Sequence, residues 1–515
     1  MKMRRDDWRY GFALFLAALT VYGLTTYGGV RSSDSEVVFR TCEALATEGS
    51  LGIAPLELDP GFGVAPGRSD QQYSVFGPLE SLVCVPFYQF WDLTRLAPES
   101  VPPSHYIDGG FKLMLERQRS STGHHRVRFV VSFLTVLVSA ANVWIFFLLI
   151  RRSCGSPPIA AVLAGLFGFA TLNWPYASTF FSEPLAMSLM LLSLLLLVGF
   201  DTGDTAAESE HDMASMGGFL AAGFLLGMSA TAHLSTVLFA PFFLCYAAGL
   251  GASEGGFKTR LLRGAQFAVG YAVPFFLLGI YNLYRFGDLL ETGRSVVPEA
   301  AARFGYGSWV APWKGLAGLL ISPGKGLLLF CPLVLLGLFA FPALLRRRRV
   351  LAVALSAAIG ARILVIASRS DWHGGFGVGP RYLLLVVPLL LLPLGAWISE
   401  RPAAGRLAAL LTVGALAAIQ QFYFVLGEIF SFYHSIWKFA EFHGRLELLE
   451  DIYFDWGFSP LLFLLGGQRG PWTLHGVGVS NTVLIVAFGA IVTASALLLY
   501  RFASREIGQR RPTVD

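Results

Sequence analysis

Two carboxylates stand just beyond the first apolar segment of the chain, in the stretch "GVRSSDSEVVFRTCEALATEGSL" from Gly29 to Leu51. Asp34 and Glu36 are separated by one serine, and a helix-like run follows them. Carboxylates in such a place can take a proton from a reacting group, bind a cation or couple ion movement to transport. Which of these they do depends on the groups that the rest of the chain brings to them.

Other ionisable and aromatic residues stand at the ends of later apolar runs. Each has an ordinary explanation, such as a helix cap for Glu183 or an interfacial side chain for Lys325 and Arg381. Ionisable groups close to a bilayer are costly unless paired or hydrated, so together they predict an aromatic-lined polar cavity. The residues beyond the first pair are Arg40, Glu43, Arg68, Tyr73, Trp174, Glu183, Asn282, Arg285, Lys325, Arg369, Asp371, Trp372, His373 and Arg381.

The composition is that of an integral membrane protein. Only 14% of the 515 residues are charged, 54% are hydrophobic and the mean hydropathy is +0.58, whereas soluble domains carry about a quarter charged residues. The apolar residues recur in windows long enough to cross about 30 Å of hydrocarbon as helices. Lys and Arg collect at helix ends and form no basic face interleaved with aromatics, so the net charge of +5 does not indicate nucleic-acid binding.

The pattern predicts an all-α polytopic bundle of about twelve transmembrane helices. Basic clusters alternate along the chain so that all of them, and both termini, fall on the cytoplasmic side by the positive-inside rule. The expected spans are 10–28, 128–150, 157–175, 182–200, 217–233, 235–251, 264–284, 325–345, 350–368, 381–398, 405–427 and 481–500.

Three long loops then lie outside, near 29–127, 285–324 and 428–480, which places any chemistry on the extracytoplasmic face. The stretch 74–91 is apolar but contains Glu80 and two prolines, so we expect an interfacial helix there. Cys42 and Cys84 share the first loop, as a disulfide or as two free thiols. We divide the chain into a catalytic transmembrane region, 1–427, and a last loop, final helix and cytoplasmic tail, 428–515.

Several familiar site motifs are excluded by their spacing. "GLLISPGKG" has five residues between Gly318 and Gly324, and Lys325 is followed by glycine, so it is not a phosphate-binding P-loop. "GGFGVGPRY" follows no strand, so it predicts no dinucleotide site, and we expect no nucleotide cofactor. HExxH and CxxC do not occur, which argues against zinc peptidases and dithiol redox enzymes.

The ordered set of motifs resembles the GT-C polytopic glycosyltransferases, in particular bacterial relatives of family 39, which includes protein O-mannosyltransferases and the aminoarabinose transferase of lipid A. The resemblance covers most of residues 10–400. Many members have adjacent acids in the first outer loop, whereas here Ser35 separates them. The matching stretches are "SSDSEVVFRTCEALATEGSL", "QQYSVFGPLESLVCVPFY", "YASTFFSEPLA", "YNLYRFGDLLETG", "GLLISPGKGLLLFCPLVLL" and "WHGGFGVGPRYLLLVVPLLLL".

This resemblance implies an inverting transfer of one sugar from a polyprenyl-phosphate carrier to a hydroxyl of a lipid, glycan or protein outside the membrane. Asp34 is the expected general base. A divalent metal, Mg²⁺ or Mn²⁺, is a possible cofactor, with Asp34, Glu36 and Glu183 as candidate ligands. The expected donor-phosphate ligands are Lys325, Arg381 and Arg285, and the expected substrate-binding residues are Glu36, Glu183, Tyr73, Asn282, Trp372, His373 and Tyr382.

Two other functions fit a membrane protein of this composition. A transporter or flippase of a lipid-linked glycan would use the acids as a coupling site and would need ionisable residues near the membrane midplane, of which Arg362 is the main example. A non-catalytic assembly partner would tolerate loss of the whole set of acids and cations. We expect the protein in a bacterial inner membrane, with its site on the extracytoplasmic side.

Overall fold

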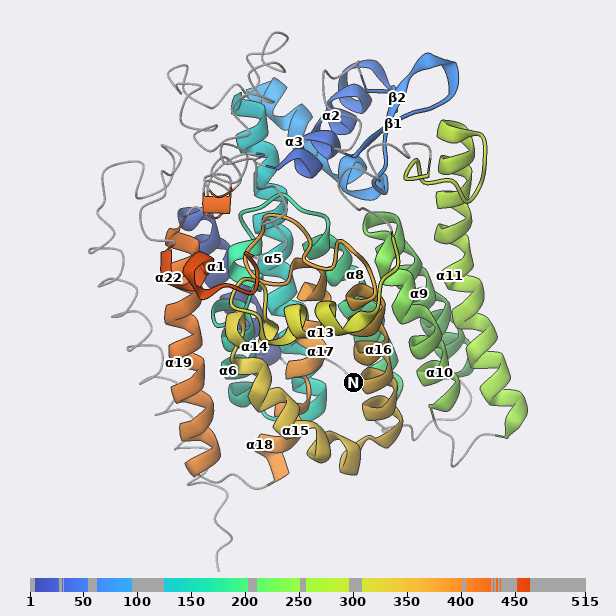
Figure 1. Ribbon diagram of the computed structural model, residues 1–515. Coiled ribbons are helices and arrows are strands. Elements are labelled where there is room, and N and C mark those ends of the chain that lie inside the picture. Colours follow the sequence, from blue (N-terminus) through green and yellow to red (C-terminus); the bar gives the residue numbers. More distant parts are fainter. Residues whose placement is uncertain are drawn as a thin grey trace, which may run out of the picture.

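The computed structural model describes residues 5–26, 30, 32–53, 63–94, 125–201, 211–250, 256–295, 308–400, 404–427, 429, 432–433, 436 and 452–463. These residues form a bundle of helices with a smaller layer of two helices and a short hairpin at one end (Figure 1). The predicted final span, 481–500, most of the last outer loop and the tail lie outside the described residues.

Six described helices are long and apolar enough to cross a membrane, by length and composition. Every predicted span from 10–28 to 405–427 overlaps a helix or a group of short helices, which confirms the helical class; the count of about twelve crossings stays a prediction. The six are Val130–Cys154, Glu183–Phe200, Phe257–Phe286, Arg349–Ala367, Arg381–Glu400 and Ala404–Leu426.

The helices of the bundle pack closely where small residues allow it. In α9, Gly223 and Gly227 lie one turn apart against α11, and a Cβ at Gly223 would come within 2.0 Å of the carbonyl oxygen of Phe267. This is the small-residue spacing by which membrane helices bring their backbones together. The bundle helices are α1 (Arg5–Thr25), α5 (His125–Cys154), α6 (Pro157–Phe169), α8 (Glu183–Phe200), α9 (His211–Ala232), η4 (Leu234–Phe239), α10 (Ala240–Gly249), α11 (Phe257–Phe286), α15 (Leu333–Arg347), α16 (Arg349–Ala367) and α19 (Ala404–Leu426).

Four predicted spans, 157–175, 235–251, 325–345 and 381–398, are formed by more than one helical element. The breaks follow prolines and glycines, which remove a backbone donor or loosen the chain, and irregular backbone at membrane depth is tolerated only when it is buried in protein. The third span stops at Phe169 and is followed by α7 (Asn173–Tyr176), all four residues of which are buried. The other interrupted spans consist of η4 and α10, of α14 (Leu327–Phe330) and α15, and of η5 (Arg381–Val386), α17 (Val387–Leu391) and α18 (Pro393–Glu400). The short helices α13 (Pro312–Ile321), η6 (Trp456–Phe458) and α22 (Pro460–Phe463) lie in segments predicted as loops.

The outer layer is built from the first predicted loop. It contains α2 (Ser33–Glu48), the 3₁₀ turn η1 (Arg68–Asp70), α3 (Leu79–Thr94) and an antiparallel hairpin of β1 (Val64–Pro66) and β2 (Gln72–Ser74). The apolar stretch expected at 74–91 is therefore a helix at 79–94, which has 16 residues and packs against α2 and α5. Figure 1 shows this layer at one end of the bundle, above α5 and α8.

The two cysteines of this layer are close together as free thiols. Cys42 of α2 and Cys84 of α3 are both fully buried in one apolar cluster, and no disulfide joins them. Burial raises the pKa of the Cys84 thiol well above its usual value, and a hydrogen bond with Cys42 raises it further. Of the two states expected from the sequence, the structure has the thiols.

The candidate site at the outer ends of α2, α8 and η5

The first turn of α2 directs its two acids to different surroundings. Ser32 caps the helix by accepting a hydrogen bond from the Ser35 amide at 3.1 Å, and acids are favoured in the turn that follows. The Ser35 hydroxyl donates to the carbonyl of Phe180 at 2.7 Å, which fixes α2 on the chain just before α8. The Asp34 side chain is 33% exposed, whereas Glu36 is 1% exposed.

Arg381 joins Asp34 to a second carboxylate. Its Nη2 lies 3.1 Å from Oδ2 of Asp34, and its Nε lies 3.2 Å from Oε1 of Glu183. These three residues come from α2, α8 and the start of η5, and 347 positions separate Asp34 from Arg381. The guanidinium also lies over the rings of Phe181 and Tyr382, at 4.4 and 5.3 Å from their centroids. One largely buried cation, whose side chain is 12% exposed, thus holds a partly exposed carboxylate.

The sequence explains why these groups meet. Glu183 is the first residue of α8 and is followed by Pro184, so it stands where the helix dipole favours a negative charge. Arg381 follows Pro380 and begins the 3₁₀ helix η5. The ion pairs of Arg381 with Glu183 and with Asp34 bring the starts of α8, η5 and α2 together.

Lys325 is placed beneath the glycine loop that leads to Arg381. Its ammonium donates hydrogen bonds to the carbonyls of Gly375 at 2.6 Å and Gly377 at 2.8 Å, and the residue is 0% exposed. It also lies 4.9 Å from the ring centroid of Tyr433. The sequence predicts a donor-phosphate ligand at this position, but the ammonium is engaged by the loop backbone.

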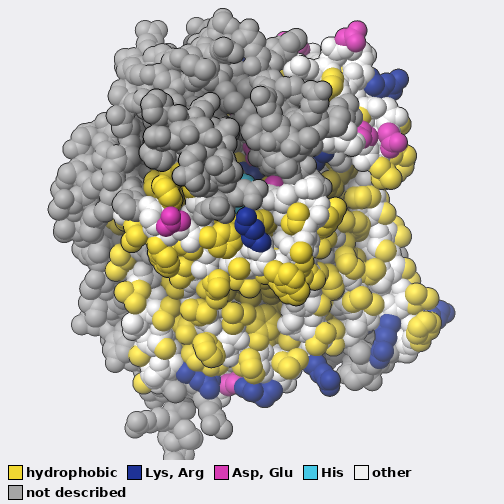
Figure 2. Space-filling view, in the orientation of Figure 1, with side chains coloured by type: hydrophobic (Ala, Val, Ile, Leu, Met, Phe, Trp, Pro, Cys, Tyr) yellow, Lys and Arg dark blue, Asp and Glu magenta, His cyan; other side chains and the backbone are white. Residues whose placement is uncertain are grey.

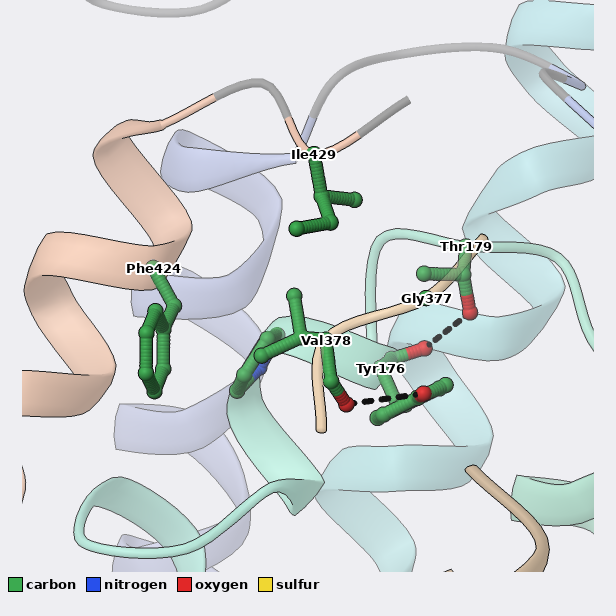
Figure 3. Close-up of a pocket in the computed structure, with 7 residues that line it drawn as sticks. Tyr176, Thr179, Gly377, Val378, Phe424 and Ile429 are labelled. Atoms are coloured by element: carbon green, nitrogen blue, oxygen red, sulfur yellow. Dashed lines mark hydrogen bonds between the residues drawn. The ribbon is translucent and has the colours of Figure 1, made fainter. Parts of the chain in front are cut away.

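The loop itself needs glycine. Gly374, Gly375 and Gly379 have φ values of 68°, 71° and 59°, which only glycine adopts readily. The Tyr176 hydroxyl donates to the carbonyl of Val378 at 3.0 Å. Figure 3 shows this contact at a small apolar cavity, whose lining residues are Pro175, Tyr176, Thr179, Gly377, Val378, Phe424 and Ile429. The loop is therefore held from both sides before it enters η5.

Lys325→Met is expected to loosen the loop between His373 and Gly379. Hydrogen bonds to a charged group contribute about 1.5–3 kcal/mol each, and methionine keeps the chain length but donates none. Hydrogen exchange of the backbone amides of 373–379, followed by mass spectrometry, should be faster than in the unmodified chain. Lys258→Met, at an exposed position of α11, is the matched control. Unchanged exchange in the Lys325 variant would show that the two carbonyl contacts do not hold the loop.

The aromatic residues of the same loop are packed rather than open. Trp372 is 4% exposed and contacts the rings of His373, Tyr453 and Phe454. His373 stacks on Tyr453 at 4.7 Å, and its Nδ1 accepts from the Gly375 amide. Burial, and next the charge of Lys325, lower the pKa of His373 to about 3, so the imidazole is neutral at physiological pH. Trp174, also expected at the cavity, is 1% exposed in the core.

Three other predicted site residues form a separate cluster on the hairpin side. Arg285, at the end of α11, donates to the carbonyl of Ser74 and to Oδ1 of Asn282, and its guanidinium lies 3.8 Å from the ring of Tyr281. Tyr73 packs against Tyr284 and Phe286. Arg285 ties α11 to β2, because a buried guanidinium needs acceptors and the strand end offers them. Its expected grouping with Arg381 as a phosphate clamp stays a prediction.

Glu36 forms ion pairs with arginines other than Arg381. Arg128 of α5 binds it through two contacts, of 2.9 Å from Nε and 2.6 Å from Nη2, and Arg40 adds a third at 2.9 Å. Burial raises the pKa of this carboxyl, but the two guanidiniums outweigh it and the pKa lies below its usual value. The pair fastens α2 to α5, and a contact of Glu36 with substrate stays a prediction.

The three acids proposed as metal ligands do not converge. Glu36 is saturated by Arg128 and Arg40, while Asp34 and Glu183 share the Arg381 guanidinium, which occupies the place between them that a cation would take. Among the described residues, no group of three His, Cys, Asp or Glu side chains is placed to hold a metal ion. The donor set present in this part of the chain does not fit Mg²⁺ or Mn²⁺.

Two further charged groups near the site, Arg294 and Glu80, are not among the predicted site residues. Arg369 forms a two-contact ion pair with Asp371, at 2.7 and 2.6 Å, and Arg294 influences the same carboxyl through space. Glu80 of α3 is 2% exposed, and burial and next the charge of Glu183 raise its pKa well above the usual value. Arg294 stands shortly after the end of a predicted span, so its position could have been used to predict it as a site residue. Glu80 is visible in the sequence only as a break in an apolar run.

Comparison with known proteins gives distant structural similarity alone. No protein-family model and no curated protein matches the sequence. ArnT from Cupriavidus metallidurans, solved bound to undecaprenyl phosphate, has 14% identity and a TM-score of 0.48, over 87% of this chain and 74% of its own. The oligosaccharyltransferase AglB from Archaeoglobus fulgidus, in complex with an inhibitory peptide and a dolichol-phosphate, has 12% identity and a TM-score of 0.48, over 89% of this chain and 61% of its own.

This chain therefore spans less than two thirds of the length of the archaeal protein. Both TM-scores are below 0.5 and both identities are below 25%. Similarity of this degree assigns no activity, so the function has to be inferred from the groups around Arg381.

Proposed function

We propose that the chain is an inverting glycosyltransferase that moves one sugar from a polyprenyl-phosphate donor to an acceptor hydroxyl at the extracytoplasmic face of a membrane. The observation that carries this proposal is the Asp34–Arg381–Glu183 cluster, in which a partly exposed carboxylate is held by a largely buried guanidinium at the ends of α2, α8 and η5. A donor anchored by its lipid in the bilayer would reach such a site from the side, so no soluble donor-binding domain is needed.

Asp34 acts as the general base in this mechanism. A hydroxyl is a poor nucleophile at neutral pH, so a carboxylate within hydrogen-bond reach takes its proton as the new bond forms. The acceptor oxygen bonds to the anomeric carbon from the face opposite the phosphate, and the bond from that carbon to the phosphate oxygen breaks. The electron pair leaves with the lipid phosphate, and the proton stays on Asp34. Arg381 fixes the carboxylate in position.

Guanidinium groups around Arg381 would support the departure of a phosphate. Negative charge grows on the leaving group in the transition state, and cations already in place stabilise it without reorganisation. Arg381 contributes one such charge, and Arg369 and Arg294 lie on the same side, since both influence the ring of Tyr382 next to it. We assign the phosphate to these guanidiniums in place of Lys325 and Arg285, whose polar contacts are with the backbone and Asn282.

The orientation rests on the distribution of charge. Lys and Arg gather along one edge of the apolar surface in Figure 2, opposite the layer that contains α2. Arg151 and Arg152 end α5, and Arg346 and Arg347 end α15, at that edge. By the positive-inside rule this edge is cytoplasmic. We therefore place both termini inside, the site outside, and the protein in a bacterial inner membrane.

The transporter hypothesis depends on a charged group inside the bundle. Arg362 of α16 is 0% exposed, and it donates to the carbonyl of Tyr382 at 3.0 Å and to the carbonyl of Ser235 at 2.9 Å. These contacts satisfy backbone acceptors at the starts of η4 and η5, where the helices are irregular. A structural role explains Arg362, so the transferase is the function we favour.

The test is a direct assay of transfer. The purified full chain is incubated with a panel of polyprenyl-phosphate sugars and lipid, glycan and peptide acceptors, and the products are analysed by mass spectrometry. We expect one donor to yield a sugar–acceptor adduct together with free polyprenyl phosphate. Movement of an intact carrier across reconstituted vesicles, without any covalent product, would favour the flippase instead.

A further inference from the structure

Helix α13 lies across the outer end of α16. Gly315 makes the crossing possible, because a Cβ there would come within 2.2 Å of the carbonyl oxygen of Ala367, the last residue of α16. The side of α13 that faces the protein is formed by Gly315, Gly318 and Leu319, all of which are buried. Figure 1 shows α13 running across the bundle between the outer layer and the long helices.

The other side of α13 is unusually aromatic for a solvent-facing surface. Trp313 is 74% exposed and Trp309, just before the helix, is 70% exposed, and Val310 and Ile321 are exposed beside them. Large exposed apolar groups in a cluster indicate a binding surface of some kind. Leu364, on the last turns of α16 directly below, is 50% exposed and continues this surface.

The surface below α13 is the apolar band of the membrane helices. Figure 2 shows hydrophobic side chains spread over this face of the bundle, with Lys and Arg at its far edge. Exposed residues of α15 and α16 that belong to the band include Leu335, Leu338, Phe339, Val350, Val353 and Leu364. The two indoles therefore stand at the end of the band that is opposite the basic edge.

We propose that Trp309 and Trp313 anchor the protein in the outer lipid headgroup region, so that α13 marks the membrane–water interface. Tryptophan is enriched at this level because its ring is amphipathic, with an apolar body and one N–H donor. The partner is the phospholipid surface itself, as the continuity of α13 with the apolar band requires. A protein partner would instead have to compete with lipid for a surface that runs into the bilayer.

This anchor is connected to the candidate site through the backbone. The amide of Val310 donates to the carbonyl of Ser368 at 2.8 Å, and the amide of Ser370 donates to the carbonyl of Ser308 at 3.0 Å. These two bonds pair the segment that carries Trp309 with the segment that carries Arg369 and Asp371. The geometry therefore puts the Arg369 guanidinium near headgroup depth, where the phosphate of any membrane lipid lies.

Depth-dependent quenching of tryptophan fluorescence tests the proposal. The full chain is reconstituted into phosphatidylcholine vesicles that carry bromine either near the headgroup or near the chain ends, and compared with Trp309→Phe/Trp313→Phe. Because both side chains are exposed, phenylalanine should leave the fold intact. The fluorescence of Trp309 and Trp313 is the difference in emission between the unmodified chain and the double variant. This difference should be quenched more by bromines near the headgroup than by bromines near the chain ends, and only weakly by aqueous iodide. Trp456→Phe, at a 53% exposed position in the last outer loop, is the control variant.

Two results would overturn the anchor. Strong quenching of the two indoles by iodide without quenching by brominated lipid would place them in water or under a soluble partner. Equal or stronger quenching by deep bromines would place α13 in the hydrocarbon. Neither measurement requires sugar transfer. The membrane anchor can therefore be disproved without disproving the proposed transferase activity, and the activity can be disproved without disproving the anchor.

Discussion

Asp34→Asn is expected to reduce sugar transfer by a factor of about 10²–10⁴, the range that general-base catalysis contributes, while the protein still folds. Asparagine has almost the same shape as aspartate and keeps an oxygen for Arg381, which lies 3.1 Å from Oδ2. It cannot take the proton of an acceptor hydroxyl. Glu183 remains on the other side of the guanidinium, so Arg381 does not lose its only carboxylate.

The measurement is the initial rate of product formation by mass spectrometry at saturating donor, with thermal unfolding in the same detergent. Asp70→Asn is the matched control, because Asp70 lies in the same loop, is exposed and has a φ of 54° that asparagine tolerates. The control should retain full activity. If the Asp34 variant transfers sugar at the unmodified rate, Asp34 is not the base; if its unfolding temperature falls with its rate, the acid serves the fold.

The meeting of Asp34 with Arg381 could be predicted because it depends on topology. Both residues stand at the outer ends of apolar segments, and the alternation of basic clusters puts those ends on one side of the bundle. The length of each span and the position of its charged residues are enough for that inference. They do not predict the individual atomic contacts, and the roles of Asp34, Glu183 and Arg381 in transfer stay predictions.

The true partners of Lys325 and Arg285 could not be predicted in the same way. Lys325 binds two backbone carbonyls of a glycine loop 50 and 52 positions away, and Arg285 binds the carbonyl of Ser74, 211 positions away. The sequence cannot show which backbone carbonyl groups will accept these hydrogen bonds, because every residue has a carbonyl group. A cation at a helix end therefore indicates the right region but not whether a ligand or the chain itself satisfies it.

The broken helices were missed for a related reason. Hydropathy treats 325–345 as one apolar window, yet the structure divides it into α14 and α15 at Cys331 and Pro332. The prolines were visible, but proline is tolerated in membrane helices when neighbouring groups satisfy the freed carbonyls. Here Gln421 of α19 donates to the carbonyl of Phe330 at 2.8 Å, a contact that only the packed bundle reveals.

Glu36→Gln is expected to lower the free energy of unfolding by about 3–5 kcal/mol, the usual cost of removing one partner of a buried ion pair. Arg128 would remain buried against Phe39, at 4.4 Å from its ring, without the carboxylate that it binds directly. The side chains of Glu36 and Arg128 are only 1% and 11% exposed, so water cannot replace the lost contacts. We expect weaker attachment of α2 to α5, with activity falling only as far as folding does.

Unfolding by heat and by denaturant in detergent measures this loss, with Glu48→Gln as the control. Glu48 is an exposed residue in the last turn of the same helix, and surface changes of this kind stay within about 0.5 kcal/mol. Replacing both partners by apolar residues, Glu36→Leu with Arg128→Met, should recover much of the stability, since no buried charge is left over. If Glu36→Gln is as stable as the unmodified chain but no longer transfers sugar, Glu36 is a substrate-binding residue instead.

The pH dependence provides an independent check on the same pair. Because the pKa of Glu36 is lower in the folded protein than its ordinary value, its contribution is complete above the unfolded pKa of about 4.3 and is lost as the pH falls through the folded pKa. The difference in stability between the unmodified chain and Glu36→Gln should therefore be constant near neutral pH and shrink in acid. A difference that grows as the pH falls would mean that the buried carboxyl is protonated in the folded state, and that Arg128 is not its partner.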